Sequence, residues 1–246
     1  MSKYMKPYNL PIMVLATGIL GLLLRLWLHS SADSSTGLLA ANHPASFLLW
    51  ALTLAVVAAI VWVSRDLKCA PRYKFNFPPF LPGAVGCLLG AVSIGISAVS
   101  EWIQYPDTLT VVASLLGILS TAALLFLADA RRKGSRPSLL YYGVICLYFM
   151  FRLVSQYRHW SADPQLMNYC FPLLASVCLM LSAYHNAAFL AKQGNRRMHT
   201  IFHLCAVYFC FLSLLGSDNF LFYLGTGIWM VTNLCNLTPM RRREAE

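Results

Sequence analysis

The sequence predicts an all-α, polytopic integral membrane protein: a bundle of eight transmembrane helices with the N- and C-termini in the cytoplasm. Three observations predict this fold. Hydrophobic residues make up 58% of the 246 residues and charged residues only 11%, whereas soluble domains contain roughly 25% charged residues. Apolar runs long enough to cross the bilayer as helices recur along the chain. The Lys and Arg residues gather in the short segments between these runs.

Each expected helix is an apolar run of about 17–25 residues, the length that spans roughly 30 Å of hydrocarbon. Such runs cover approximately residues 10–28, 45–63, 81–102, 108–128, 139–157, 169–190, 198–216 and 220–237. The third run contains Gly86 and Gly90, small residues that let a neighbouring helix approach closely. It is therefore expected to be enclosed by protein. The segment Arg131–Pro137 is expected to be a basic loop, and residues 1–246 form a single transmembrane domain.

A weak similarity between two of the runs indicates an internal duplication. Arg25 follows an apolar stretch and precedes Leu-Trp, and Arg152 lies in a similar context before Leu-Val. Two four-helix halves, about residues 1–128 and 138–240, would then share one orientation, as in membrane proteins built from parallel repeats.

The distribution of cationic residues predicts the orientation in the membrane. Cytoplasmic loops carry an excess of Lys and Arg, and eight crossings place 16 of the 19 Lys and Arg residues on one face. These residues are Lys3, Lys6, Arg65, Lys68, Arg72, Lys74, Arg131, Arg132, Lys133, Arg136, Lys192, Arg196, Arg197, Arg241, Arg242 and Arg243. Topology thus explains the net charge of +10, and nucleic-acid binding is not expected. Short loops favour the plasma (inner) membrane of a bacterial cell, with the lipid bilayer as the main partner.

The first apolar run is expected to remain in the protein. It is longer than the hydrophobic region of a cleaved signal peptide, which is about 7–15 residues, and it contains Arg25.

Polar side chains near the outer ends of three runs predict an outward-opening vestibule. Arg152 and Gln156 are four residues apart and share one helix face, while Glu101 and Arg25 lie near the outer ends of the third and first runs. Ionisable residues at membrane depth are costly unless paired or hydrated, and guanidinium groups bind carboxylate or phosphate bidentately. Arg25, Glu101, Arg152 and Gln156 are therefore the candidate binding residues for an anionic or polar small molecule.

Simpler interpretations of the same residues stay open. The Arg25 side chain could extend to the lipid headgroups. Glu101 and Arg152 could form a purely structural ion pair between two helices.

A second candidate site lies at the cytoplasmic end. His199 and His203 are four residues apart, so both rings can face one metal ion, with His185 or Asp129 as a third ligand. The segment His199-Thr-Ile-Phe-His203-Leu resembles the paired-histidine segment of the hemolysin III and progestin/adipoQ receptor family of zinc-containing membrane proteins. This resemblance covers six residues and implies a zinc-dependent membrane hydrolase with His199 and His203 as zinc ligands. The second run has no His, and the third no Asp at its inner end, to match the family's other ligands.

No motif decides between these functions. The chain contains no P-loop, G-x-G-x-x-G, G-x-S-x-G or H-E-x-x-H motif, and its eight cysteines include no C-x-x-C pair. The paired histidines could simply contact lipid phosphates. Three hypotheses therefore remain: a small transporter or ligand-binding membrane subunit without a cofactor, a non-catalytic scaffold within a larger membrane complex of unknown partners, and the zinc hydrolase. An enzyme is the less favoured class.

Overall fold

The computed structural model describes residues 9–31, 43–67, 73–105, 107–160, 166–215 and 219–235. All regular secondary structure in these ranges is helical. The elements are α1 (Asn9–Ser30), α2 (Pro44–Val63), the 3-10 turn η1 (Ser64–Asp66), α3 (Tyr73–Asn76), α4 (Leu81–Gln104), α5 (Thr108–Lys133), α6 (Leu139–Trp160), α7 (Leu166–Leu190), α8 (Arg196–Leu212) and α9 (Phe220–Cys235).

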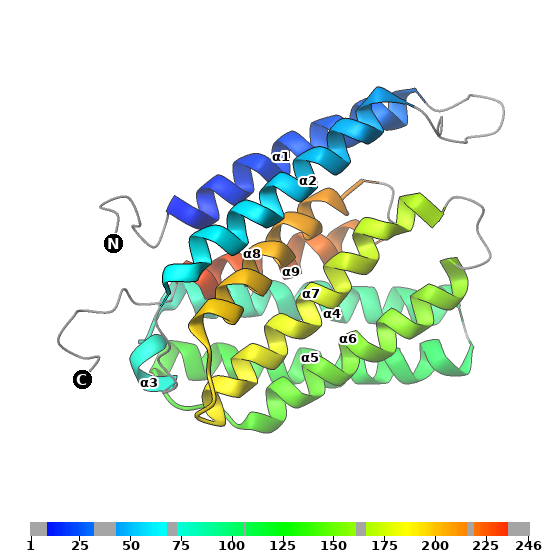
Figure 1. The fold of residues 1–246 in the computed structure, drawn as a ribbon. Coiled ribbons are helices and arrows are strands. Elements are labelled where there is room, and N and C mark those ends of the chain that lie inside the picture. Colours follow the sequence, from blue (N-terminus) through cyan, green and yellow to red (C-terminus); the bar gives the residue numbers. More distant parts are fainter. Residues whose placement is uncertain are drawn as a thin grey trace.

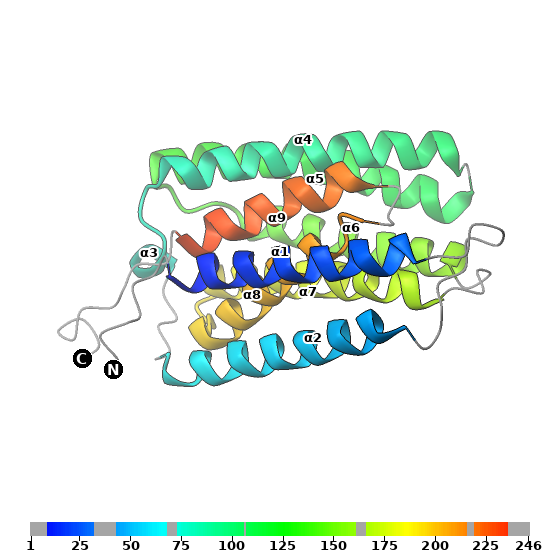
Figure 2. The ribbon, with the colours of Figure 1, turned by 90° about the horizontal axis from the view of Figure 1, so that it is seen from above.

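The long helices run back and forth along one common direction (Figure 1). Each helix from α4 to α9 packs against the next one in sequence, and α9 packs back against α4, which closes a ring of six helices. The α1–α2 hairpin lies outside this ring, where α1 contacts α8 and α9 (Figures 1 and 2). The described chain starts at Asn9 and stops at Cys235, at the same end of the bundle (Figure 1).

Six of the described helices, α1, α2, α4, α5, α6 and α7, are long and apolar enough to cross a membrane. α8 has 17 residues and α9 has 16, or about 26 and 24 Å at a rise of about 1.5 Å per residue. Large apolar side chains stay on the outside of the bundle; Leu54, Trp62 and Ile103 are 69%, 75% and 77% exposed. Helices that expose such side chains need lipid around them, so the architecture is that of a multi-pass helical membrane protein.

The helix ends follow local sequence signals. At the start of α2, the His43 side chain accepts a hydrogen bond from the Ala45 amide at 3.2 Å. At the start of α8, Asn195 Oδ1 accepts from the Arg197 amide at 3.0 Å. Both are N-caps that satisfy amides without a partner inside the helix. α5 stops at Gly134, whose φ of 67° is the left-handed conformation that glycine adopts without strain.

Glycines bring α4 and α9 into close contact. A Cβ atom added to Gly86 would lie 1.9 Å from Thr232 Oγ1, and one added to Gly225 would lie 2.3 Å from Ser93 Oγ. α5 and α9 therefore cover one side of the third apolar run. The opposite side of α4 is exposed, with Val85, Ile96 and Val92 47%, 50% and 57% exposed, so the expectation that protein encloses this helix holds for one face only.

The structure corrects one expected loop. Arg131 was expected in the basic segment Arg131–Pro137, but α5 continues through it to Lys133. The Arg131 side chain is buried, with its guanidinium 4.2 Å above the Phe77 ring and 3.3 Å from the Tyr142 hydroxyl. These aromatic and hydroxyl groups stabilise the buried Arg131 guanidinium inside the bundle. α5 therefore extends beyond the apolar run from which it was predicted.

Candidate functional site: a polar cavity at one end of the helix ring

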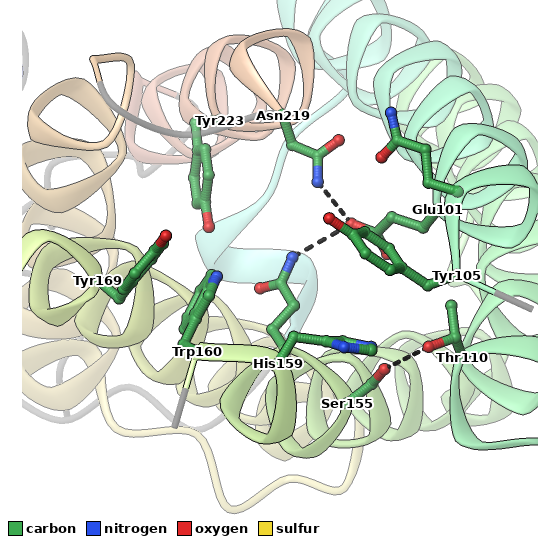
Figure 3. A pocket seen from close by; sticks show the side chains of 11 residues that line it. Glu101, Tyr105, Thr110, Ser155, His159, Trp160, Tyr169, Asn219 and Tyr223 are labelled. Carbon is green, nitrogen blue, oxygen red and sulfur yellow. Dashed lines mark hydrogen bonds between the residues drawn. The ribbon is translucent and has the colours of Figure 1, made fainter. Parts of the chain in front are cut away.

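A cavity of about 250 Å³ opens at the end of the ring opposite Asn9 and Cys235. Side chains from α4, α5, α6, α7 and α9 line it, together with residues from the connections before α5 and α9 (Figure 3). The lining residues are Glu101, Gln104, Tyr105, Thr110, Ser155, Gln156, His159, Trp160, Tyr169, Asn219 and Tyr223.

Glu101 is the centre of the hydrogen-bond network at this cavity. Its Oε1 atom accepts from Arg152 Nη2 at 2.7 Å and Nε at 3.1 Å, and from Ser97 Oγ at 3.2 Å. The amides of Asn219 and Gln156 donate to the same oxygen at 2.8 and 3.1 Å (Figure 3). No hydrogen bond to Glu101 Oε2 occurs within the described ranges, and the side chain keeps 9% of its surface exposed. One carboxylate oxygen is thus saturated, and the other is left toward the cavity.

Arg152 forms a buried ion pair with Glu101 on the side away from the cavity. Its side chain has no exposed surface, it donates to Gln156 Oε1 at 3.2 Å, and its guanidinium carbon lies 3.6 Å from the Phe222 ring centroid. Arg152 is therefore held by Glu101, Gln156 and an aromatic face, and it is not among the residues that line the cavity. Burying both charges is tolerated because donors and acceptors are paired.

The structure brings three of the four predicted binding residues together and leaves the fourth elsewhere. Glu101, Arg152 and Gln156 form one hydrogen-bonded group. Arg25 donates instead to the Leu212 carbonyl at the end of α8, and its guanidinium lies 5.5 Å from the Phe171 ring. At 2% exposure it is buried between helices and does not extend to the headgroups. Its position outside the ring follows from the packing of α1 on α8.

A carboxylate and an imidazole lie at the rim. Asp107 Oδ1 is 3.5 Å from His159 Nε2, and both side chains are more than one third exposed. The Thr110 hydroxyl donates to the same Asp107 oxygen at 2.5 Å. This hydrogen bond lowers the pKa of the Asp107 carboxyl, and the nearby His159 adds to the effect.

Aromatic and amide residues of the cavity were missed by sequence reasoning. Tyr169 and Trp160 stack with ring centroids 4.9 Å apart, and Tyr105 packs on His159 at 4.6 Å. In sequence these aromatics are typical of the membrane interface. Asn219 lies beside a short turn and carries no signal of its own.

The predicted metal ligands at the opposite end form a different arrangement. The rings of His199 and His203 stack with centroids 3.8 Å apart, and Asn186 lies between their Nε2 atoms at 3.1 and 3.2 Å. His203 Nδ1 is 2.8 Å from the His199 carbonyl, which can only accept, so Nδ1 donates and Nε2 accepts from the Asn186 amide. Both nitrogens of His203 are therefore used in hydrogen bonds.

The other two predicted metal ligands lie apart from this pair. His185 stacks on the Phe202 ring with centroids 5.2 Å apart, and Asp129 pairs with Lys133 at 2.6 Å on the surface. No group of three His, Cys, Asp or Glu side chains that could hold a metal ion exists within the described part of the chain. The prediction of a zinc site from His199, His203, His185 and Asp129 is therefore not supported by the geometry, because Asn186 takes the place of a metal between the rings.

Comparisons with protein-family models, curated proteins and solved structures find no match. The six-residue resemblance at His199 is thus not accompanied by a family match. The cavity around Glu101 remains the best-formed candidate site.

Proposed function

We propose that this chain is a ligand-binding or transport protein of a cell membrane, and that the cavity around Glu101 receives a small polar molecule from the outer side. The observation that carries the proposal is a carboxylate with one saturated oxygen and one open oxygen at the bottom of a polar, aromatic-lined cavity. Small-molecule sites combine apolar walls with a few convergent polar groups in this way.

A second polar group in the cavity supports ligand binding. Tyr223 is 1% exposed, and its hydroxyl lies near Arg152 and Ser176 without forming a hydrogen bond of good geometry to either. An unpaired buried hydroxyl costs about 1–3 kcal/mol. A ligand or water in the cavity would supply the partner.

The cavity lining restricts the charge of the ligand that was expected from the sequence. Neither Arg25 nor Arg152 lines the cavity, and no other guanidinium of the described residues does, so the described lining offers none to an anionic group. A polar ligand without a net negative charge suits the lining better.

The proposal also includes eight membrane crossings with the basic end inside. α8 and α9 are short, but both lie within the closed ring and α1 packs on both. Helices sheltered by their neighbours need not match the hydrocarbon thickness themselves. Arg65, Lys133 and Lys192 lie at the ends of α2, α5 and α7, all at the end away from the cavity (Figure 1). The cationic bias then places the cavity outside.

A thermal-shift screen of small polar molecules on purified protein tests the proposal. Ligands that bind the folded state raise Tm, with about 2.7 kcal/mol of stabilisation at a concentration of 100 Kd. We expect active compounds to stabilise wild type but not Tyr169→Ala, which removes one wall of the cavity.

Tyr184→Ala is the matched control. Tyr184 is also on α7, but it is 59% exposed and does not line the cavity. Compounds that stabilise all three proteins equally, or a screen in which nothing stabilises wild type, would contradict binding at this cavity.

A further inference from the structure

We propose that the ligand of the Glu101 cavity is an organic cation carrying a primary or secondary ammonium group, whose N–H groups donate to Glu101 Oε2 and Asn219 Oδ1. This inference rests on the proposed function, because it names the chemistry of the molecule that the same cavity would receive. Three properties of the lining carry it: the direction of its hydrogen bonds, its charges and its aromatic walls.

The hydrogen bonds leave two oxygens of lining residues without a donor among the described residues. A carboxylate has no proton to donate, so Asn219 must turn its Nδ2 toward Glu101 Oε1, at 2.8 Å. Its Oδ1 then points away from Glu101, as Figure 3 shows. Gln156 uses its Nε2 on Glu101 in the same way, and its Oε1 already accepts from Arg152. Both amides thus use an N–H group on Glu101 Oε1, whereas Glu101 Oε2 and Asn219 Oδ1 accept no hydrogen bond from the described residues, so a ligand that donates hydrogen bonds complements these two oxygens.

The charges of the lining exclude an anion and accept a cation. Glu101 is the lining residue with a full negative charge, and no Lys or Arg lines the cavity among the described residues. Arg152 compensates this charge from a fully buried position behind Oε1. The Glu101 carboxylate would repel an anionic ligand. It would attract a cation at Oε2, because the positive charge of Arg152 lies on the far side of the carboxylate.

Aromatic walls favour the same class of ligand. Tyr105, Trp160, Tyr169 and Tyr223 all line the cavity, and the negative faces of aromatic rings attract ammonium groups, most strongly when water is excluded. The rings also offer apolar surface to the carbon skeleton of such a molecule. Glu101 and Asn219 lie on one side of the cavity and the rings of Tyr223, Trp160 and Tyr169 on the other (Figure 3). This arrangement matches an amine with an apolar body.

Three probes that share one apolar body and differ in the head group test this inference: 2-phenylethylammonium, 2-phenylethanol and 3-phenylpropionate. Their binding to purified protein is measured by saturation-transfer NMR, with Kd values from titration. We expect the ammonium probe to bind at least tenfold more tightly than the alcohol, because a hydrogen bond to a charged group is worth more than one between neutral groups. The carboxylate probe should bind more weakly than either.

Two variants locate the binding. Asn219→Leu removes one acceptor but leaves the Glu101–Arg152 contact in place, and it should weaken binding of the ammonium probe by about tenfold. The double variant Glu101→Gln/Arg152→Met removes the carboxylate together with its buried partner charge, so that no unpaired guanidinium remains. It should abolish the preference for the ammonium probe over the alcohol probe. Tyr184→Ala should bind all three probes as wild type does.

The outcomes separate this inference from the function on which it rests. Equal or tighter binding of the alcohol or the carboxylate probe, or no binding of the ammonium probe, overturns the cation assignment. If Tyr169→Ala still removes stabilisation by an uncharged compound from the screen, the cavity remains a ligand site and only its assigned chemistry is wrong. An ammonium preference that survives both variants places the binding elsewhere and also overturns the inference.

Discussion

At the scale of single residues, Glu101 and Arg152 decide the character of the cavity. Their contact at 2.7 Å is nearly free of solvent, with 9% and 0% of the two side chains exposed. Removing one member of such a pair leaves the other charge buried without compensation, which costs about 3–5 kcal/mol. Replacing both by apolar residues removes that penalty.

We therefore expect Arg152→Leu to lower the free energy of unfolding by about 3 kcal/mol, and Glu101→Leu/Arg152→Leu to recover most of this loss. Unfolding in detergent, followed by circular dichroism, measures both. Glu101→Leu alone is measured in the same way. If the double variant loses as much free energy of unfolding as Glu101→Leu and Arg152→Leu lose together, the two charges act independently and the expectation is wrong.

The sequence was informative about which polar residues matter but less so about their partners. Helical spacing placed Arg152 and Gln156 on one face, and the structure has them hydrogen bonded. Arg25 looked equivalent to Arg152 along the chain, yet it binds the Leu212 carbonyl. Which helix faces which is set by packing between segments far apart in sequence. Neighbouring residues therefore cannot reveal it.

The same reason explains the two histidines. Spacing alone correctly put the His199 and His203 rings side by side. It could not show that Asn186 of α7 would fill the space between their Nε2 atoms, because the pairing of α7 with α8 determines that contact.

At the scale of helices, the hydropathy of the chain predicts most of the boundaries and the packing decides the rest. α4 and α6 start where the apolar runs start. α5 runs past its apolar segment to Lys133, because Arg131 is buried among aromatic side chains. Apolar length therefore identifies a helix, but a charged residue that finds aromatic partners can lengthen it.

Glycine packing between α4 and α9 gives a prediction at this scale. Gly225→Ala would place a Cβ 2.3 Å from Ser93 Oγ and 3.0 Å from the Leu89 carbonyl oxygen. We expect a loss of stability of about 1–3 kcal/mol from overpacking, seen as a lower Tm of purified protein.

Gly143→Ala is the matched control for this prediction. Gly143 lies on α6 with nothing within 4 Å of the added Cβ, so alanine should be neutral or stabilising by up to about 1 kcal/mol. Equal effects at the two glycines would argue against close packing of α4 on α9.

At the scale of the whole molecule, the fold separates two chemically different ends. One end holds the cavity with Glu101 and the rim residue Asp107. The other holds the basic helix ends and the buried Arg131 and His199. Composition and the spacing of apolar runs predicted the helical membrane architecture. A cavity between five helices depends on side chains from all of them, so no single segment could predict it.

The central claim is that the cavity faces the outside and the basic end faces the cytoplasm. The most direct test is labelling of intact cells by a membrane-impermeant thiol reagent, in a chain whose eight native cysteines are replaced by serine. Gln104→Cys places a thiol at the cavity and Ser135→Cys places one after α5, both at exposed positions. We predict labelling of Gln104→Cys in intact cells and of Ser135→Cys only after permeabilisation. Labelling of Ser135→Cys alone in intact cells, or of both positions from one side, would contradict the account.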